Sequence, residues 1–277
     1  MKVYNVKTGV LLEHENKFYR VENTNWTDFI NDDGLAQKIQ SLVKTLTPVA
    51  DAKGIIDNEV VAPIQDQELW ACGVTYYRSS VARQEESKDA GGGDFYARVY
   101  EAERPEVFFK STPHRVVGPG GKVKIRKDST WDVPEPELTL VVTSSGKIVG
   151  YTIGNDMSSR SIEGQNPLYL PQAKTYDACA AVGPCVLVTD EIPGSTSIHL
   201  AIFRNKEKAF EGTITVDQMK RTPKELVSFV YRECSFPNGS LIMTGTGIVP
   251  SNEFTLQSGD EIKITIDGIG TLVNTVA

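Results

Sequence analysis

Three acidic residues near the middle of the chain have the composition of a metal site. Glu135 and Glu137 stand two residues apart in the segment PEPEL, and Asp156 follows in the segment GNDMSSR. Carboxylate oxygens alone are the ligands that hard divalent ions prefer, Mg²⁺ or Mn²⁺ first and Ca²⁺ next, with water or substrate in the remaining positions. A metal held in this way would polarise an oxygen of a small substrate.

A hairpin can bring these acids together. Side chains two apart on a strand share a face, so Glu135 and Glu137 project together. A two-residue loop at Ser145-Gly146 pairs residue 144 with residue 147, and counting outward from this pair sets Asp156 opposite Glu135 and Gly154 opposite Glu137. The sequence therefore predicts three carboxylates on one face at one end of a hairpin.

Two alternatives stay open for this cluster. A Glu-x-Glu pair is more often a solvated strand face than a metal site, and a slip of one residue would send Asp156 to the other face of the sheet. Like charges that face one another destabilise a strand pair unless a cation neutralises them, which favours a metal site if the register holds.

The composition bounds the class of protein. The chain has 277 residues, 40% of them hydrophobic and 23% charged, which are ordinary values for a globular protein, and no apolar run is long enough to cross a membrane. The net charge of −7 and the lack of a Lys/Arg cluster argue against a nucleic-acid partner. The N-terminal segment lacks the continuous apolar stretch of a secretory signal, so we expect a cytoplasmic protein. Four scattered cysteines without a CxxC pair indicate neither a disulfide scaffold nor a zinc site.

The pattern of apolar residues predicts a mixed α/β, β-rich chain in two parts. Residues 1–62 read as a small N-terminal α/β domain, with a strand-like start from Lys2 to Leu12 and a helix from about Asp33 to Leu46. Residues 63–277 read as a β-rich body of short apolar stretches separated by turn residues. Its clearest helix runs from Thr222 to Glu233, opened by Thr222-Pro223 as cap and first residue. The glycine-rich Gly91 to Asp94 reads as a flexible loop, because no Lys-Ser/Thr follows as in a phosphate loop.

Four blocks of the body resemble the catalytic core of the fumarylacetoacetate hydrolase superfamily, and they occur in the order of that family. They are PEPEL (134–138), GYT to NDMSSR (150–160), AKTYD with a following Gly-Pro (173–184), and TGTG (244–247). The resemblance extends over roughly residues 66 to 277. It implies a β-roll fold and a homodimer or homotetramer.

The resemblance also implies roles for single residues. Glu135, Glu137 and Asp156 are then the metal ligands, Lys174 lies beside a metal-bound 2-oxo acid, and Thr246 binds its oxo-acid end. Read alone, Lys174 could be a surface lysine and Thr246 a turn residue chosen for its hydroxyl, but the context of the four blocks favours the functional roles.

One departure from the family pattern points to a subfamily. Hydrolases and decarboxylases of this superfamily carry an Asn-Tyr-x-x-His segment with a Glu three residues after the His, which together activate water. Here Ser79 replaces the His and Ala82 replaces the Glu. The surrounding segments, from Gly73 to Ser87 and from Tyr100 to Lys110, are similar to 2-keto-3-deoxy-D-arabinonate dehydratases, which eliminate water to give 2-oxoglutarate semialdehyde in pentose catabolism. Elimination needs an acid and a base but no activated water.

A strand from Glu106 to Lys110 would put Glu106, Phe108 and Lys110 on one face. We therefore expect Glu106 to be the general acid/base, with Ser79 as a relay or hydroxyl contact and Lys110 near the substrate. The alternative is that Glu106 pairs with an arginine on the surface. Arg78 is expected to meet a substrate hydroxyl or carboxylate, and an ion pair with Glu85 or Glu86 is the alternative.

The function expected from the sequence is thus a Mg²⁺-dependent dehydratase of a 2-keto-3-deoxy sugar acid. An acylpyruvate hydrolase or oxaloacetate decarboxylase of the same superfamily is the first rival, and a metal-binding protein without activity is the second. No dinucleotide-binding glycine motif follows a strand, so an oxidoreductase has little support.

Overall fold

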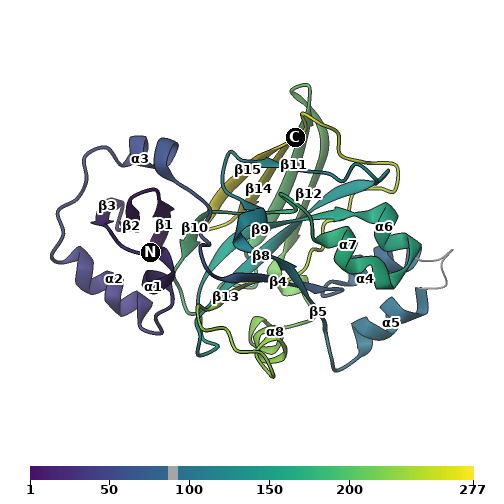
Figure 1. The fold of residues 1–277 in the computed structure, drawn as a ribbon, viewed down its shortest axis with the longest axis horizontal. Coiled ribbons are helices and arrows are strands. Elements are labelled where there is room, and N and C mark those ends of the chain that lie inside the picture. The colour runs from purple at the N-terminus through teal and green to yellow at the C-terminus, as the bar shows by residue number, and fades with distance from the viewer. Residues whose placement is uncertain (87–92) are drawn as a thin grey trace.

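The larger of two β-sheets carries the predicted metal residues. Within residues 1–86 and 93–277, which the computed structural model describes, it has ten strands. They are β1 (Lys2–Val6), β2 (Gly9–His14), β3 (Lys17–Glu22), β4 (Glu68–Gly73), β5 (Glu106–Ser111), β6 (Val116–Val117), β8 (Asp132–Val142), β9 (Ile148–Ser159), β10 (Ala180–Leu187) and β13 (Ser240–Met243). Their order is β3-β2-β1-β10-β9-β8-β13-β4-β5, with β6 paired to β10 (Figure 1). The β8–β9 hairpin therefore has a hydrogen-bonded neighbour on each side.

The smaller sheet packs against one face of the larger one. It consists of β7 (Lys122–Val123), β11 (Ser197–Arg204), β12 (Glu207–Thr215), β14 (Glu261–Ile266) and β15 (Gly270–Val276), in the order β12-β11-β14-β15-β7. Alternate residues of β14 are buried, and Ile262 and Ile264 share one apolar cluster with Leu138 and Leu140 of β8. The even-numbered side chains of this part of β8 thus face the second sheet, which leaves the odd-numbered ones, Glu135 and Glu137 among them, for the other face. The mixed α/β, β-rich fold expected from the sequence is confirmed.

The predicted pairing of the acidic residues is confirmed, but the predicted turn is wrong. Glu135 pairs with Asp156, and Glu137 pairs with Gly154. The turn has three residues rather than two, because Thr143 pairs with Lys147 through a 2.9 Å hydrogen bond and Gly146 has a positive φ of 83°. A bulge between Val141 and Val142 then shifts the register by one residue and restores the expected pairs.

The N-terminal region extends the larger sheet. β1 pairs with β10 of the body, and the helices α1 (Trp26–Ile30), α2 (Leu35–Val43) and α3 (Ala52–Glu59) accompany the first three strands. The predicted strand from Lys2 to Leu12 is in fact a β-hairpin, and the predicted helix is shorter at both ends. Apolar residues of this region share a buried cluster with residues of the body. The division at residue 62 remains a prediction about the chain's organisation.

Helices cover the end of the larger sheet where the acids lie (Figure 1). They are α4 (Tyr77–Glu86), α5 (Gly93–Glu101), α6 (Arg160–Gln165) and α7 (Leu170–Lys174), while α8 (Pro223–Val230) lies apart, and short 3₁₀ turns are η1 (Pro113–Arg115), η2 (Pro167–Tyr169) and η3 (Val216–Gln218). Thr222 caps α8 in a capping box with Glu225, which confirms the predicted start of that helix. Of the predicted glycine-rich loop, Gly91 and Gly92 lie outside the described residues, and Gly93 begins α5. No helix in the described part of the chain has the length and hydropathy that a membrane span needs.

Candidate active site

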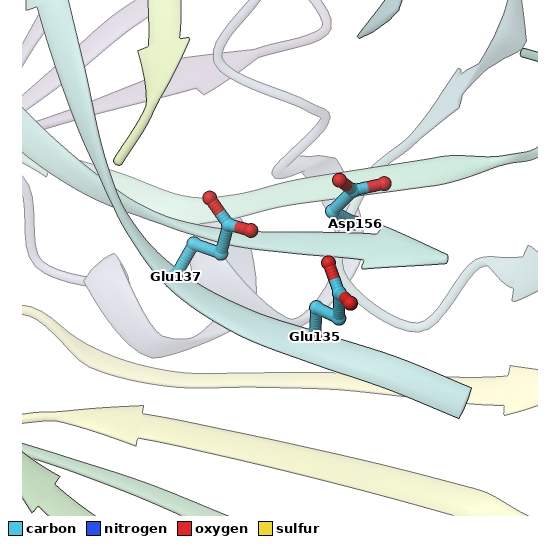
Figure 2. Close-up of side chains that lie close together, drawn as sticks. All are labelled: Glu135, Glu137 and Asp156. Atoms are coloured by element: carbon cyan, nitrogen blue, oxygen red, sulfur yellow. The ribbon is translucent and has the colours of Figure 1, made fainter. Parts of the chain in front are cut away.

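Glu135, Glu137 and Asp156 form a buried carboxylate cluster. One oxygen atom from each residue lies within 4.8 Å of the others, and all three side chains point to the same side of the β8–β9 hairpin (Figure 2). Their residues are at most 6% exposed. The pairing of Glu135 with Asp156 across the strands produces this convergence directly.

This cluster is electrostatically unfavourable without a cation. Burial raises the pKa of Glu135, and it raises the pKa of Glu137 well above its usual value, with the neighbouring carboxylates adding to both shifts. Glu137 forms no ion pair with any residue that the structure describes. Its Oε2 atom accepts a 2.5 Å hydrogen bond from the backbone N–H of Gly245, whose φ of 91° suits glycine. Three buried carboxylates that converge, one of them without an ion pair among the described residues, fit a hard dication such as Mg²⁺.

Lys174 lies between two of the three carboxylates. Its Nζ atom is 2.7 Å from Glu135 Oε2, 3.0 Å from Asp156 Oδ2 and 2.5 Å from Ser158 Oγ. Burial lowers the pKa of Lys174, but the surrounding carboxylates raise it by more, so that the pKa lies above its usual value. The lysine predicted to lie beside the substrate is therefore a buried cation at the cluster and not a surface residue.

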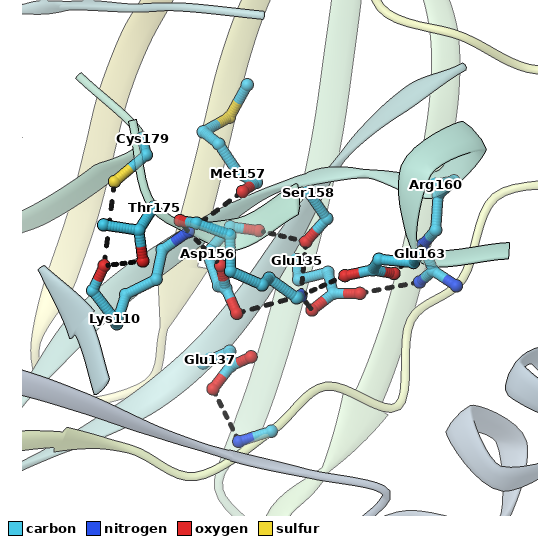
Figure 3. Close-up of polar contacts among 12 residues, drawn as sticks. Lys110, Glu135, Glu137, Asp156, Met157, Ser158, Arg160, Glu163, Thr175 and Cys179 are labelled. Carbon is cyan, nitrogen blue, oxygen red and sulfur yellow. Dashed lines mark hydrogen bonds and ion pairs between the residues drawn. The ribbon is translucent and has the colours of Figure 1, made fainter. Parts of the chain in front are cut away.

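Lys110 does not lie where the sequence analysis placed it. We expected a substrate contact, but Lys110 is fully buried and does not line the cavity at the cluster. Its ammonium group contacts Asp156 Oδ1 at 2.5 Å and donates to the backbone oxygens of Met157 and Lys174 (Figure 3). The ammonium group thus has two hydrogen bonds and an ion pair within the protein, and Lys110 orients Asp156 instead.

A second layer of charges surrounds the cluster (Figure 3). Glu163 of α6 is fully buried and lies 2.7 Å from Arg83, 3.2 Å from Lys174 and 3.9 Å from Arg160. Arg160 in turn donates to Glu135 Oε1 at 2.7 Å. Although burial raises the pKa of Glu163, the three cations lower it to about 2. Glu163 is therefore a charged group inside the protein.

Glu106 lies close to this site with an unpaired oxygen atom. It pairs with Gly73 across β5 and β4, and its buried Oε2 has no hydrogen-bond partner in the described residues. Burial raises the pKa of Glu106, while Arg83 and Lys174 partly oppose that effect. The alternative of a surface ion pair with an arginine is not observed in residues 1–86 and 93–277. Phe108, two residues farther along the strand, lines the cavity at the carboxylate cluster. Glu106 does not line the cavity itself, but its carboxylate lies against Gly73, which does.

A small cavity adjoins the carboxylate cluster. The carboxylates, Lys174, Arg160 and Phe108 form one part of its lining. Ser79 and Arg83 line it from α4, one helical turn apart, and Thr246 lines it from the loop after β13. The Ser79 hydroxyl donates to the backbone oxygen of Tyr76 at 2.7 Å, and the Thr246 hydroxyl accepts from the N–H of Ile248 at 3.2 Å. Both hydroxyl groups are buried at the cavity, as expected for residues near a substrate.

Arg78 is exposed and does not line this cavity. Because α4 turns through 3.6 residues per turn, Ser79 and Arg83 share the face that the cavity needs, and Arg78 does not lie on it. Its alternative partners, Glu85 and Glu86, have side chains outside the described part of the chain. The structure thus offers Arg83 rather than Arg78 as the arginine nearest a substrate.

Three charged residues of the site were not singled out by the sequence analysis: Arg83, Arg160 and Glu163. Arg160 lies in a family-like block, and Glu163 follows it at the i,i+3 spacing that puts both on one side of a helix. That spacing is common on exposed helices, so it carries no signal of burial. The contact between Glu163 and Arg83 joins segments 80 residues apart and has no local pattern at all.

The comparisons with known proteins agree on one family. Residues 74–277 match the model described as fumarylacetoacetate (FAA) hydrolase C-terminal. The chain is 48% identical over 242 residues to a probable 2-keto-3-deoxyxylonate dehydratase of Haloferax volcanii, covering 86% of this chain and 82% of the relative. It is 42% identical over 240 residues to 2-dehydro-3-deoxy-D-arabinonate dehydratase of Saccharolobus solfataricus, covering 86% of this chain and 78% of the relative.

Solved structures are similar to this chain over its whole length. One of them is described as 2-keto-3-deoxy-D-arabinonate dehydratase complexed with magnesium and 2,5-dioxopentanoate, and it matches with a TM-score of 0.85 and 34% sequence identity, covering 100% of this chain and 98% of that chain. The apo form of the same enzyme matches with the same score and identity.

Proposed function

The chain belongs to the fumarylacetoacetate hydrolase family, and on that premise we propose that it is a Mg²⁺-dependent dehydratase that removes water from a 2-keto-3-deoxy pentonate to give 2,5-dioxopentanoate. The observation that carries the proposal is the carboxylate cluster of Glu135, Glu137 and Asp156, with the unpaired acid Glu106 nearby. Elimination next to a carbonyl group requires a metal-binding set and an acid/base group, and Glu106 lies against Gly73, a residue of the cavity beside the cluster.

The two relatives' names fit one substrate. D-Arabinonate and D-xylonate differ only at C2 and C3, and these carbons become the oxo group and the methylene group of the 2-keto-3-deoxy acid. Both sugar acids therefore lead to the same compound, which has a single stereocentre at C4. We propose this compound, with the D configuration at C4, as the substrate of the chain.

Glu135, Glu137 and Asp156 would hold the metal ion, each through a carboxylate oxygen. When bound, Mg²⁺ supplies Lewis-acid polarisation of the 2-oxo group, which is worth several kcal/mol. Lys174, which contacts Glu135 and Asp156, would place a positive charge beside the oxo-acid end of the substrate. The Thr246 hydroxyl, on the wall of the same cavity, would bind that end as well.

Glu106 would move the proton of the elimination. Its carboxylate takes a proton from C3 and leaves the electron pair to be shared with the polarised 2-oxo group. The carboxyl group then gives the proton to the C4 hydroxyl, the C4–O bond breaks, and water departs. One group thus serves as base and then acid, with Ser79, which lines the cavity from α4, as a hydroxyl contact or relay.

The remaining steps only rearrange hydrogen atoms. Loss of water leaves a 2-oxo acid with a C3=C4 double bond and a C5 hydroxyl. Transfer of a proton from C5 to C3 gives an enol at C4 and C5, and this enol becomes the aldehyde when C4 is protonated and the O–H proton is lost. No oxidant or reductant is needed, since 2,5-dioxopentanoate is the substrate less one water.

Turnover of 2-keto-3-deoxy-D-arabinonate, with and without EDTA and added Mg²⁺, tests the proposal. We expect formation of 2,5-dioxopentanoate that stops with EDTA and returns with Mg²⁺. Cleavage of acylpyruvate or oxaloacetate, with no turnover of the sugar acid, would instead favour the hydrolase or decarboxylase alternative. Mg²⁺ binding without turnover of any 2-oxo acid would indicate a protein that has lost the activity.

Glu106→Gln tests the acid/base role within this reaction. The variant should lose at least about 10²-fold in kcat, the usual cost of a lost acid/base group, and should keep its Mg²⁺ affinity. An unimpaired variant would remove Glu106 from the mechanism.

We further propose a cytoplasmic homodimer or homotetramer that acts in pentose catabolism. The pathway follows from the pentonate named for the relatives. Sedimentation of the purified protein distinguishes a dimer or tetramer from a monomer.

A further inference from the structure

Glu163 has contacts that the proposed chemistry does not use. Its side chain is 0% exposed, and it does not line the cavity at the carboxylate cluster. Oε1 lies 3.2 Å from Lys174 Nζ, and Oε2 lies 2.7 Å from Arg83 and 3.9 Å from Arg160. A single buried carboxylate thus connects α4, α6 and α7.

Lys174 has three carboxylate partners, and they differ in kind. Two of them, Glu135 and Asp156, are proposed metal ligands, while the third, Glu163, is not. An ammonium ion and a dication compete for the same carboxylates, because each is stabilised by the same negative charge. Once a metal ion occupies Glu135 and Asp156, Glu163 is the remaining carboxylate among these partners that can hold the ammonium group in place.

Glu163 also provides an ion-pair partner that positions Arg83. Arg83 lines the cavity from α4, and its Nη1 atom lies 2.7 Å from Glu163 Oε2. Long cationic side chains lose considerable conformational freedom when they are ordered, so a fixed partner matters for their position. One carboxylate therefore orients two cations of the cavity wall.

We propose that Glu163 is a positioning residue that draws Lys174 away from the metal carboxylates and holds Arg83 against the cavity, and that it thereby sets the affinity for Mg²⁺. The metal part of this inference concerns binding alone. The part that concerns turnover rests on the proposed dehydratase function.

Calorimetric titration of Mg²⁺ into chelator-stripped protein tests the metal part. Glu163→Gln should weaken Mg²⁺ binding by about 10- to 100-fold, as is typical for residues that orient metal ligands. The matched control is Asp260→Asn, which removes another fully buried carboxylate paired with an arginine, Arg204 at 2.7 Å, away from the cavity. Both variants should lose thermal stability, but Asp260→Asn should bind Mg²⁺ like the wild type.

A double-mutant cycle shows whether Lys174 transmits the effect. In a Lys174→Met background the competing ammonium group is absent, so adding Glu163→Gln should change Mg²⁺ affinity much less than it does in the wild type. An equal loss in both backgrounds would overturn the competition. If Glu163→Gln does not fold, Glu163→Asp, which keeps the charge but is one methylene shorter, should fold and show an intermediate loss of affinity.

Kinetics at saturating Mg²⁺ test the contact between Glu163 and Arg83 separately from the effect on metal binding. If Glu163 also holds Arg83, Glu163→Gln should keep a raised KM for the sugar acid after the metal site is filled. Wild-type Mg²⁺ affinity, kcat and KM in a folded but less stable Glu163→Gln variant would show a purely structural residue. Absence of turnover in the wild type would count against the proposed function and leave the titration results valid.

Discussion

The carboxylate of Glu106 lies over Gly73, its partner on the neighbouring strand, in the space that a β-carbon at position 73 would occupy. A β-carbon built on Gly73 overlaps Glu106 Oε2, and the three atoms nearest to it among the described residues all belong to Glu106. The position of the proposed acid/base therefore depends on the absence of a side chain opposite it.

Gly73→Ala should displace the Glu106 carboxylate without disturbing the sheet, because the overlapping atoms belong to the end of a flexible side chain. We expect kcat to fall by roughly 10- to 100-fold, approaching the loss for a missing acid/base group, with little change in Mg²⁺ affinity. Steady-state kinetics and Mg²⁺ titration measure the two effects. Gly34→Ala, where the added carbon meets nothing closer than 3.4 Å, is the control. Wild-type kcat in Gly73→Ala would argue against Glu106.

The pH dependence of turnover should reflect the environment of Glu106. Burial raises its pKa above the usual 4.5, so the carboxylate form appears only at a higher pH than for a free glutamate. Because the proposed reaction begins with the carboxylate, kcat/KM should rise with pH through this raised pKa. The profile is measured with Mg²⁺ saturating at every pH, and the rising limb should be absent from the residual activity of Glu106→Gln. The same limb in the variant would assign it to another group.

Lys110→Met tests whether Lys110 stabilises Asp156, as the structure indicates, or contacts the substrate, as its strand position led us to expect. The variant leaves Asp156 without its contact to Lys110 and leaves the oxygens of Met157 and Lys174 without a donor. Removing one partner of a buried pair costs about 3–5 kcal/mol, so we expect that loss in the free energy of unfolding, measured with denaturant. Added Mg²⁺ should recover part of it. A raised KM with unchanged stability would instead support a substrate contact.

Asp132, at the start of β8, should make the protein less stable at neutral pH. It is 3% exposed, its Oδ1 has no hydrogen-bond partner within the described residues, and burial raises its pKa from 3.8 to about 6. The folded protein thus keeps a proton that the unfolded chain releases near pH 4, so the contribution of Asp132 to stability falls as the pH rises from about 4 to about 6.

Asp132→Asn removes this titration. The variant should be more stable than the wild type at pH 8, while the difference should shrink toward pH 4, as measured by denaturant midpoints at the two pH values. An equal difference in stability between variant and wild type at pH 4 and pH 8 would mean that the charge of Asp132 does not cause the difference.

The sequence was sufficient for features that depend on local periodicity. Alternation along a strand put Glu135 and Glu137 on one face, and hairpin counting paired Glu135 with Asp156, as the structure confirms. The count succeeded although the turn was wrong, because the additional turn residue and the bulge after Val141 offset each other. The same alternation put Lys110 on the correct face but could not give its depth.

Features that depend on packing between distant segments were not predictable. Glu163 contacts Arg83 from another helix, and nothing near either residue in the sequence marks the contact. The sequence analysis expected Arg78 at the substrate, whereas the helix brings Arg83 to the same face as Ser79. A charge pattern on a short helix does not show which members are buried.

The bulge between Val141 and Val142 also determines whether the metal site can form. It offsets the odd number of residues in the turn, so that Glu135 and Asp156 face each other although the loop has three residues. If the turn kept its three residues and the bulge were removed, the pairing beyond it would shift by one residue and Asp156 would turn to the face opposite Glu135. The geometry of the carboxylate cluster therefore depends on backbone irregularity in a part of the hairpin that does not contact the metal.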